Sequence, residues 1–280
     1  MSIRIVTDST ADIPVETANK LNIKVVPLNV HFGQSTFKDG IDLTTDNFFD
    51  KLIQGPHFPS TSQPSIGDFM EAYKPIIEKG DEIISIHISS KLSGTTNSAI
   101  QAAEQLKSDG NIAVVDTLQA SLTVGLTAMA AAKAVLEGKV FQEVVDLAKS
   151  TSDRAELFAL LDTLEYLEKG GRIGKARALV GGLLKIKPLI TIMDGEVGEF
   201  GKVRSRQSGI QKLKEVCQNA GNLESLVVAY STEEEDALKL SQELTSILPG
   251  NESPMIARVG PVIGTHAGPR VIAVGMIKSK

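Results

Sequence analysis

Short runs of aliphatic and β-branched residues alternate with helix-length segments along the first half of the chain. Strands are expected at residues 3–6, 24–30, 82–88 and 112–115, and the longest helix between or after them covers residues 120–137. This alternation is typical of β–α–β units, in which the strands run parallel in one sheet. Since helices cover a parallel sheet, the pattern predicts an α/β fold for this half.

The second half alternates less regularly. Residues 188–193 and 196–203 are both β-rich and flank Asp194-Gly195, a pattern typical of a β-hairpin. Because a hairpin brings antiparallel strands into a sheet, a mixed sheet is expected here. Further elements are expected as helices at 164–169, 209–219 and 233–247 and as strands at 157–161, 225–230, 254–258 and 271–277.

The change of pattern near residue 155 predicts two domains. A chain of 280 residues fits one large or two modest domains. We expect an N-terminal α/β domain at residues 1–155 with a parallel sheet. We expect a C-terminal α/β domain at residues 156–280 with a mixed sheet.

Composition and motifs exclude several classes of function. The formal net charge of −5 argues against nucleic acid as the partner, because phosphate backbones bind to basic surfaces. The dinucleotide fingerprint and the P-loop pattern are both absent. His31, His57 and His87 lack metal-ligand spacing to one another or to Cys217, so no metal site is expected. No other cofactor is expected either. With no Trp and 4% aromatic residues, any pocket is expected to be aliphatic.

The sequence predicts a cytoplasmic location. Cys217 is the single cysteine, so no internal disulfide can form, as is usual in a reducing compartment. The first residues lack the charged and apolar regions of a signal peptide. Residues 120–137 are the best candidate for a membrane span, but Lys133 interrupts them and alanine dominates them. We therefore expect no transmembrane segment, and at most transient contact with a membrane.

Four loops are rich in hydroxyl side chains and glycine, at residues 7–10, 61–65, 93–96 and 264–266. In open α/β sheets, ligands bind where loops leave the carboxyl ends of the strands. The loops at Thr7 and Ser93 follow expected strands and precede expected helices, where backbone N–H groups favour an anion. These loops are the candidate binding site.

Two of these loops have more than one interpretation. In Ser93-Gly94-Thr95 the glycine lets the backbone approach a ligand and the hydroxyls can donate to an anionic oxygen, but Ser93 can equally cap the next helix. Thr61-Ser62 either lines a site or forms a turn before a helix that begins near Ile66. Both interpretations stay open for both segments.

His266 lies in a glycine-rich segment that is expected to be a loop. A histidine there can hydrogen-bond a carboxyl group or shuttle a proton, although a structural role is the alternative. Arg172 and Arg204 each belong to a basic cluster. Such clusters are either solvated surface or a surface that grips phosphate or carboxylate groups.

Taken together, these segments resemble the DegV family, the fatty-acid-binding proteins that serve a bacterial fatty acid kinase. The resemblance covers essentially the whole chain. Six segments carry it in order, namely Thr7-Asp8-Ser9-Thr10-Ala11-Asp12, Phe37-Lys38-Asp39-Gly40, Thr61-Ser62-Gln63-Pro64-Ser65, Ser90-Lys91-Leu92-Ser93-Gly94-Thr95, Leu167-Glu168-Lys169-Gly170-Gly171-Arg172-Ile173 and Gly264-Thr265-His266.

The resemblance implies two α/β domains with a long-chain fatty acid, such as palmitate, buried in a tunnel at or near their junction. It implies that Thr61 and Ser93 bind the carboxyl group and that His266 lies nearby. Ser62, Gly94, Thr95 and Thr265 would belong to the adjoining loops.

The resemblance also implies a partner. Members of the family present the bound acid to a separate ATP-dependent kinase, which phosphorylates the carboxylate, and the acyl-phosphate feeds phospholipid synthesis. Arg172 and Arg204 would contact the kinase or the acyl-phosphate. On this interpretation the chain has no catalytic activity of its own.

Two other functions remain as alternatives. The first is a serine hydrolase with Ser93 as nucleophile and His266 as base, although the residues around Ser93 do not form the Gly-x-Ser-x-Gly elbow. The second is an interaction protein in which the lipid is a structural filler.

Overall fold

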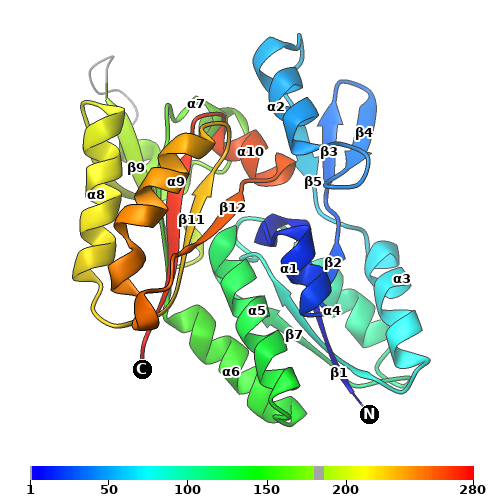
Figure 1. Cartoon of the computed structure of the whole chain (residues 1–280). Coiled ribbons are helices and arrows are strands. Elements are labelled where there is room, and N and C mark those ends of the chain that lie inside the picture. The colour runs from blue at the N-terminus through cyan, green and yellow to red at the C-terminus, as the bar shows by residue number, and fades with distance from the viewer. Residues whose placement is uncertain (1, 180–185) are drawn as a thin grey trace.

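The structure is a computed structural model that describes residues 2–179 and 186–280. Its strands form three sheets (Figure 1): a four-stranded parallel sheet, a three-stranded antiparallel sheet and a six-stranded mixed sheet. The predicted α/β class, with a parallel sheet followed by a mixed one, is confirmed.

The parallel sheet has the strand order β2-β1-β6-β7, and its strands are joined by helices. Ile83 of β6 packs with α3 and α4, whereas Ile84 packs with α5 and α6. Because successive side chains point to opposite faces of a strand, helices cover both faces. This explains the near-continuous apolar runs in the sequence. The elements are β1 (Ile3–Asp8), α1 (Val15–Lys20), β2 (Lys24–Val26), α3 (Ile66–Ile77), β6 (Glu82–His87), α4 (Thr95–Gln105), β7 (Ile112–Asp116), α5 (Leu122–Leu136) and α6 (Phe141–Asp153).

The three-stranded sheet was not predicted. It consists of β3 (Asn29–Phe32), β4 (Ser35–Lys38) and β5 (Ser60–Ser62), with α2 (Thr45–Gln54) between β4 and β5. The single strand expected at 24–30 is wrong, because the chain leaves the parallel sheet after Val26 and enters the small sheet at Asn29. Pro27, which has no N–H to donate to a ladder, lies at this break.

The segment Thr61-Ser62 is therefore part of strand β5 rather than a turn. Asn29 pairs with Ser62 and Val30 pairs with Thr61. The turn interpretation failed because three polar residues lack the apolar alternation that identifies a strand. The small sheet holds Thr61 in a fixed orientation.

The mixed sheet has the strand order β10-β9-β8-β13-β11-β12, with one parallel pair, β11 and β12. The predicted hairpin of β9 and β10 is confirmed, and Asp194 and Gly195 both have positive φ, +52° and +82°. The expected domain boundary coincides with the start of β8 and stays a prediction. The elements are β8 (Ala155–Leu160), α7 (Glu165–Lys169), β9 (Lys187–Met193), β10 (Glu196–Val203), α8 (Arg206–Asn219), β11 (Leu223–Tyr230), α9 (Glu234–Glu243), β12 (Met255–Arg258), α10 (Pro261–Ala267) and β13 (Ile272–Lys278).

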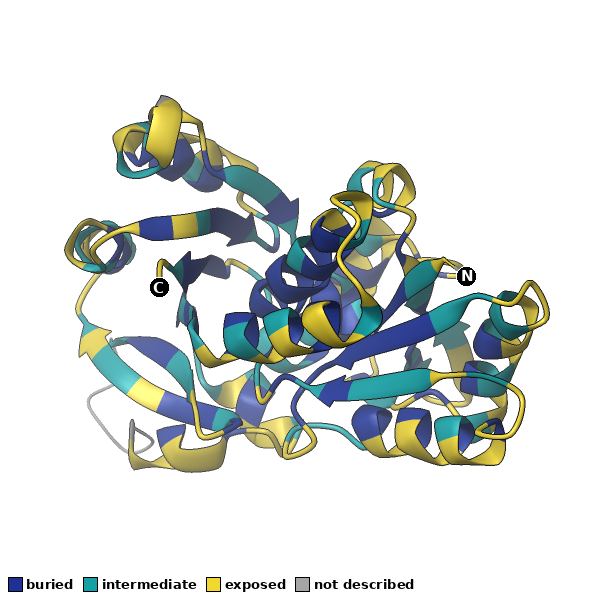
Figure 2. Cartoon of the chain, turned by 90° about the horizontal axis from the view of Figure 1, so that it is seen from below, coloured by how far each residue is buried: buried dark blue, intermediate teal, exposed yellow. Residues whose placement is uncertain are grey.

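The two faces of the mixed sheet have different neighbours. Leu160 and Val274 pack with α8 and α9 on one face. Ala159 and Ala273 belong to the other face and to the core that also contains α5 and one face of the parallel sheet. Figure 2 shows buried residues gathered on the strands and the inner helix faces, and exposed ones on the outer helix faces. One apolar core thus joins the two sheets.

Helix α10 replaces the loop expected at residues 264–266. Pro261 begins the helix, as proline often does at the first helical position, and Gly268 with a φ of +81° ends it. Gly264 suggested a loop, but it lies inside the helix. Its lack of a side chain lets Phe48 and Phe49 pack against α10, because a Cβ there would lie 2.8 Å from Phe48 and 2.9 Å from Phe49.

Two further helices differ from the prediction. α6 was not predicted, because Gly138, with a φ of +83°, is the only strong break between it and the long apolar α5. The helix expected at 233–247 ends at Glu243 and is followed by a 3-10 turn at 245–247.

Within residues 2–179 and 186–280, no helix has both the length and the hydropathy needed to cross a membrane.

Candidate functional site

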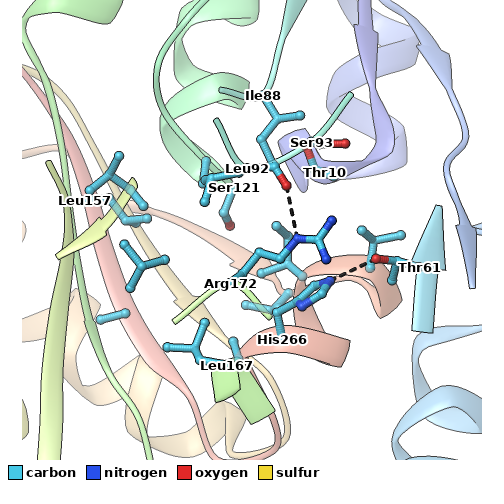
Figure 3. A pocket seen from close by; sticks show the side chains of 18 of the residues that line it. Thr10, Thr61, Ile88, Leu92, Ser93, Ser121, Leu157, Leu167, Arg172 and His266 are labelled. Carbon is cyan, nitrogen blue, oxygen red and sulfur yellow. Dashed lines mark hydrogen bonds between the residues drawn. The ribbon is translucent and has the colours of Figure 1, made fainter. Parts of the chain in front are cut away.

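A pocket lies where the three sheets meet, between the carboxyl end of the parallel sheet and the inner face of the mixed sheet (Figure 3). Its volume is about 920 Å³, including the part open to solvent. Among the described residues that line it, only Arg172 and His266 are ionisable. The pocket therefore has the composition of a site for a mostly apolar ligand with a small polar group.

The body of the pocket is aliphatic. Leu157 and Ala159 of β8 and Ile190 and Ile192 of β9 point into it, as does Ala273 of β13. Residues two apart on a strand share a face, so these side chains form one continuous wall of the mixed sheet. The expectation of an aliphatic rather than an aromatic pocket agrees with this wall.

Segments that follow parallel strands form part of the polar side of the pocket. Thr10 follows β1, Ser93 follows β6 and Ser121 follows β7. Figure 3 shows Thr10, Ser93 and Thr61 on one side of the pocket and Leu157 on the opposite side. In open α/β sheets, ligands bind at the carboxyl ends of the strands, which is why the loops at Thr7 and Ser93 were singled out in the sequence. The same rule applies to Ser121, which the sequence analysis missed.

Thr10 is held by a buried carboxylate. Asp8 accepts hydrogen bonds from the backbone N–H of Thr10, at 3.0 Å, and from its hydroxyl. The other oxygen of Asp8 faces His87 Nδ1 at 2.9 Å and accepts from the N–H of Ile88 at 3.2 Å. Asp8 and His87 have no exposed surface, so they serve as a support for the pocket wall rather than as groups that meet a ligand.

Thr61 and His266 meet at the polar side although 205 residues separate them. Thr61 Oγ1 of β5 and His266 Nε2 of α10 are joined by a hydrogen bond of 2.9 Å (Figure 3). His266 Nδ1 is buried and has no partner within the described residues. Burial, together with the positive charge of Arg172, lowers the pKa of His266 to about 4. The ring is therefore neutral at neutral pH.

Ser93 lies both beside the start of α4 and at the pocket, but it is not the cap residue of the helix. Its Oγ lies 2.8 Å from Thr95 Oγ1 and accepts from the Thr95 N–H at 3.3 Å, next to the start of α4. The residue at the cap position is Gly94, which has no side chain to bond with. Ser93 also lines the pocket. In the part of the chain that the structure describes, no hydrogen bond joins Ser93 to His266.

The other residues of the predicted site are distributed unevenly. Ser62 lines the pocket beside Thr61. Thr95 and Thr265 are buried, and Thr265 donates to the carbonyl of Pro261 within its own helix at 2.9 Å. Gly94 faces Gln63, because a Cβ on it would lie 2.8 Å from Gln63 Nε2. Of these four, only Ser62 lies in the pocket lining.

Arg172 lies at the pocket and Arg204 does not. The Arg172 side chain is exposed, and its guanidinium donates to the carbonyl of Leu92 at 3.2 Å and to that of Gly170 at 2.9 Å. A polar hollow beside it shares Leu92, Ser93 and Arg172 with the pocket. Arg204 is exposed beyond the end of β10, the opposite end of that strand from the pocket-lining Val197.

The described residues contain no group of three or more His, Cys, Asp or Glu side chains arranged to hold a metal ion.

Comparisons with known proteins agree with this architecture. The model of the family described as "Uncharacterised protein, DegV family" matches residues 2–279. A DegV domain-containing protein from Deinococcus radiodurans is 36% identical over 283 residues, covering 99% of this chain and 98% of the relative.

Two solved structures share the whole fold. A DegV family protein from Thermus thermophilus, described by its fatty acid binding, is 35% identical with a TM-score of 0.92 and full coverage of both chains. A stearic acid-binding protein from Eubacterium ventriosum is 30% identical with a TM-score of 0.90, covering 99% of this chain and 98% of the other. The family model and these relatives extend along the whole chain, and the chain belongs to the DegV family, as its six segments predicted.

Proposed function

We propose that this protein binds one long-chain fatty acid in the pocket at the meeting point of the three sheets. The observation that carries the proposal is the combination of a continuous aliphatic wall with a small polar side formed by Thr61, Ser93 and His266. The fatty acid binding and stearic acid binding described for two structures of the same fold support it.

The aliphatic wall supplies most of the affinity. Each methylene group that leaves water contributes about 0.8 kcal/mol, so a chain of 16 carbons such as palmitate retains a large driving force after the entropy cost of binding. The acyl chain would lie along Leu157, Ile190 and Ala273.

The carboxyl group needs hydrogen-bond donors, because an unpaired carboxylate in an apolar pocket is costly. A neutral His266 that donates from Nε2 to Thr61 Oγ1 leaves the Thr61 hydroxyl hydrogen free to donate to the ligand. The hydroxyl of Ser93 is a second donor on the same side. The pKa of about 4 supports this assignment, because it keeps the ring uncharged beside the ligand.

We further propose that the protein presents the carboxyl group to an ATP-dependent kinase and does not itself catalyse a reaction. Arg172 supports this part, because it is exposed and lies beside both the pocket and the polar hollow at its edge. A guanidinium at that position would bind an incoming or newly formed phosphoryl group bidentately. Arg204 remains a candidate for contact with the kinase alone, because it lies away from the pocket.

The hydrolase alternative has weak geometric support. Ser93 is hydrogen-bonded to Thr95, and His266 to Thr61. A catalytic histidine also needs an acidic partner on its second nitrogen, whereas His266 Nδ1 has none in the described part of the chain.

The kinase role can be tested with protein loaded with palmitate, a fatty acid kinase and radiolabelled ATP. We expect acyl-phosphate to form only when both proteins are present, and Arg172→Ala to lower its rate without loss of bound palmitate. Lys175→Ala is a matched control, because Lys175 is an exposed cation close in sequence that pairs with Asp194 instead. Equal rates for wild type and Arg172→Ala would contradict the assigned role of Arg172. Formation of no acyl-phosphate by the wild type would contradict presentation.

A further inference from the structure

Two buried carboxyl groups lie together outside the pocket, at the start of helix α10. They are Asp12 and Asp39, which come from two of the six family segments and do not themselves line the pocket. A Cβ on Gly260, the residue before α10, would lie 3.0 Å from Asp12 Oδ1 and 3.8 and 3.9 Å from the two oxygens of Asp39. Both carboxyl groups therefore flank the same short stretch of backbone.

Asp12 connects three parts of the chain. Its Oδ1 accepts a hydrogen bond from the N–H of Gly260 at 2.9 Å, and its Oδ2 accepts one from the hydroxyl of Ser121 at 2.5 Å. Ser121 lines the pocket at the start of α5. Asp12 thus links the loop after β1, the start of α5 and the start of α10.

Asp39 is the second carboxyl group beside the start of α10. It follows β4, and the hydroxyl of Ser9 and the backbone N–H of Val262, in the first turn of α10, lie near enough to favour its ionised form. The Ser9 hydroxyl oxygen in turn accepts from the N–H of Leu28, which lines the pocket. Two carboxyl groups from the first 40 residues therefore lie against the start of a helix more than 200 residues later.

Helix α10 forms one wall of the pocket. The pocket lining includes four of its residues, Val262, Ile263, His266 and Ala267. The first turn, beside the two carboxyl groups, and the turn that carries His266 belong to the same short helix. Ser121 has a backbone φ of +53° and ψ of −132°, which a serine rarely adopts. The hydrogen bond to Asp12 helps to retain this conformation at the pocket wall.

We propose that Asp12 and Asp39 are positioning residues of the fatty acid site, which hold the first turn of α10 and thereby fix His266 beside Thr61. This inference rests on the proposed function, because only that function makes His266 part of a fatty acid site. The position of His266 can nevertheless be measured without any ligand.

The pair also makes the position of α10 sensitive to pH. Burial is the main reason that the pKa of Asp12 is raised to about 8 and that of Asp39 to about 7, and the charge of Asp8 adds to both. The charged and titratable groups that line the same cleft are Asp8, Lys24, Tyr230, Glu234 and Arg258. At pH 6 both carboxyl groups are mostly protonated, near pH 7 Asp39 is about half ionised, and at pH 9 both are ionised and repel each other at the start of α10.

The test compares alanine and asparagine variants of the full chain. Asp12→Ala and Asp39→Ala remove the acceptors, and we expect each to weaken palmitate binding at least tenfold and to shift the ring signals of His266 in NMR spectra. Asp12→Asn and Asp39→Asn keep an acceptor and resemble the protonated acids, so we expect affinities within threefold of wild type at pH 7.

Asp46→Ala is the matched control. Asp46 also joins the two halves of the chain, through an ion pair of 2.6 Å with Arg258, but it does not touch α10 through that pair. We expect it to leave both palmitate affinity and the His266 signals unchanged. The assignment of the His266 signals comes from their loss in His266→Gln.

The pH dependence of the His266 signals distinguishes a positioning role of Asp12 and Asp39 from a purely structural one. Residues with only a structural role would not make these signals depend on pH. Because the ring itself titrates near pH 4, changes between pH 6 and 9 report on its neighbours. We expect such changes in wild type and their loss in the Asp12→Asn/Asp39→Asn double variant. If they persist unchanged in the double variant, the proposal is wrong, and this holds even if the alanine variants do not fold.

Folded alanine variants with wild-type affinity and wild-type His266 signals would equally overturn the proposal. A wild-type protein that does not bind palmitate would contradict the proposed function. The His266 signals would still decide whether Asp12 and Asp39 position α10.

Discussion

Gly170 lies so close to the ring of His266 that a Cβ on Gly170 would overlap Nδ1 and come within 2.9 Å of Cε1. The backbone of Gly170 has ordinary helical angles, so its need for glycine comes from this contact and not from a special conformation. Gly171 differs, because its φ is +68° and a Cβ on it would meet no atom within 4 Å. Glycine is therefore required at the two adjacent positions for different reasons, contact with His266 at Gly170 and backbone conformation at Gly171.

The contact predicts opposite results for two alanine substitutions. Gly170→Ala should push the His266 ring away from Thr61 and weaken fatty acid binding by about tenfold or more, because the hydrogen bond of 2.9 Å would be lost. Gly171→Ala should cost about 1 kcal/mol of stability through backbone strain and leave binding unchanged. Calorimetric titration with palmitate and thermal unfolding measure the two effects. Equal affinities of the two variants would contradict this account of Gly170.

Thr61→Val should weaken binding of the acid without affecting the fold. The substitution keeps the side-chain shape but removes the hydroxyl, which leaves the carboxyl group and His266 Nε2 each short of a partner. We expect a loss of about 1–3 kcal/mol in binding free energy, measured as the change in the dissociation constant of palmitate.

Thr36→Val is the control for this variant. Thr36 lies on β4 of the same small sheet and also bonds to a histidine ring, His31 Nδ1, at 2.9 Å, but it does not line the pocket. A Thr61→Val protein with the affinity of Thr36→Val would show that the hydroxyl does not contact the ligand.

His266 should make the protein less stable in acid. The folded protein has a pKa of about 4 at this residue, below the value of 6.5 for the free side chain. Between these values the unfolded chain binds a proton that the folded protein does not, so stability falls as the pH decreases from 6.5 to 4. The free energy of unfolding from denaturant titrations should lose on the order of 1–3 kcal/mol over this range, and His266→Gln should lose less. An identical acid slope in both proteins would contradict the lowered pKa.

Asp12 and Asp39 should have the opposite effect on the alkaline side. Their folded pKa values of about 8 and 7 lie above the value of 3.8 for a free aspartate. The folded protein therefore keeps protons that the unfolded chain releases, and stability decreases as the pH rises from 4 towards 8. Between pH 6.5 and 8, where His266 no longer contributes, the decrease should be visible in wild type and smaller in Asp12→Asn/Asp39→Asn. Parallel curves for the two proteins would contradict the raised pKa values.

The parallel sheet could be predicted from sequence because its buried strands are continuous apolar runs, as at Ile83 and Ile84. The small sheet could not, since β5 is Ser60-Thr61-Ser62 and it pairs with residues of β3 that lie 29 to 33 positions earlier in the chain. Helix α10 was missed for a related reason. Gly264 indicates a loop in isolation, and only the packing of Phe48 and Phe49 against it explains a glycine inside a helix.

The site was predictable in part. Hydroxyl-rich segments pointed to Thr61 and Ser93, and both line the pocket. The hydrogen bond between Thr61 and His266 was not predictable, because no local pattern relates residues from β5 and α10. Ser121 was missed although it follows a parallel strand, because the segment Thr117–Ser121 has only two hydroxyl residues and no glycine.

Native mass spectrometry of the purified protein, followed by denaturation and identification of the released lipid, tests the proposed function most directly. We expect one fatty acid per chain, or stoichiometric uptake of added palmitate by protein from which lipid has been extracted. A protein that carries no fatty acid as purified and takes up neither palmitate nor oleate would contradict the assignment of the pocket as a fatty acid site.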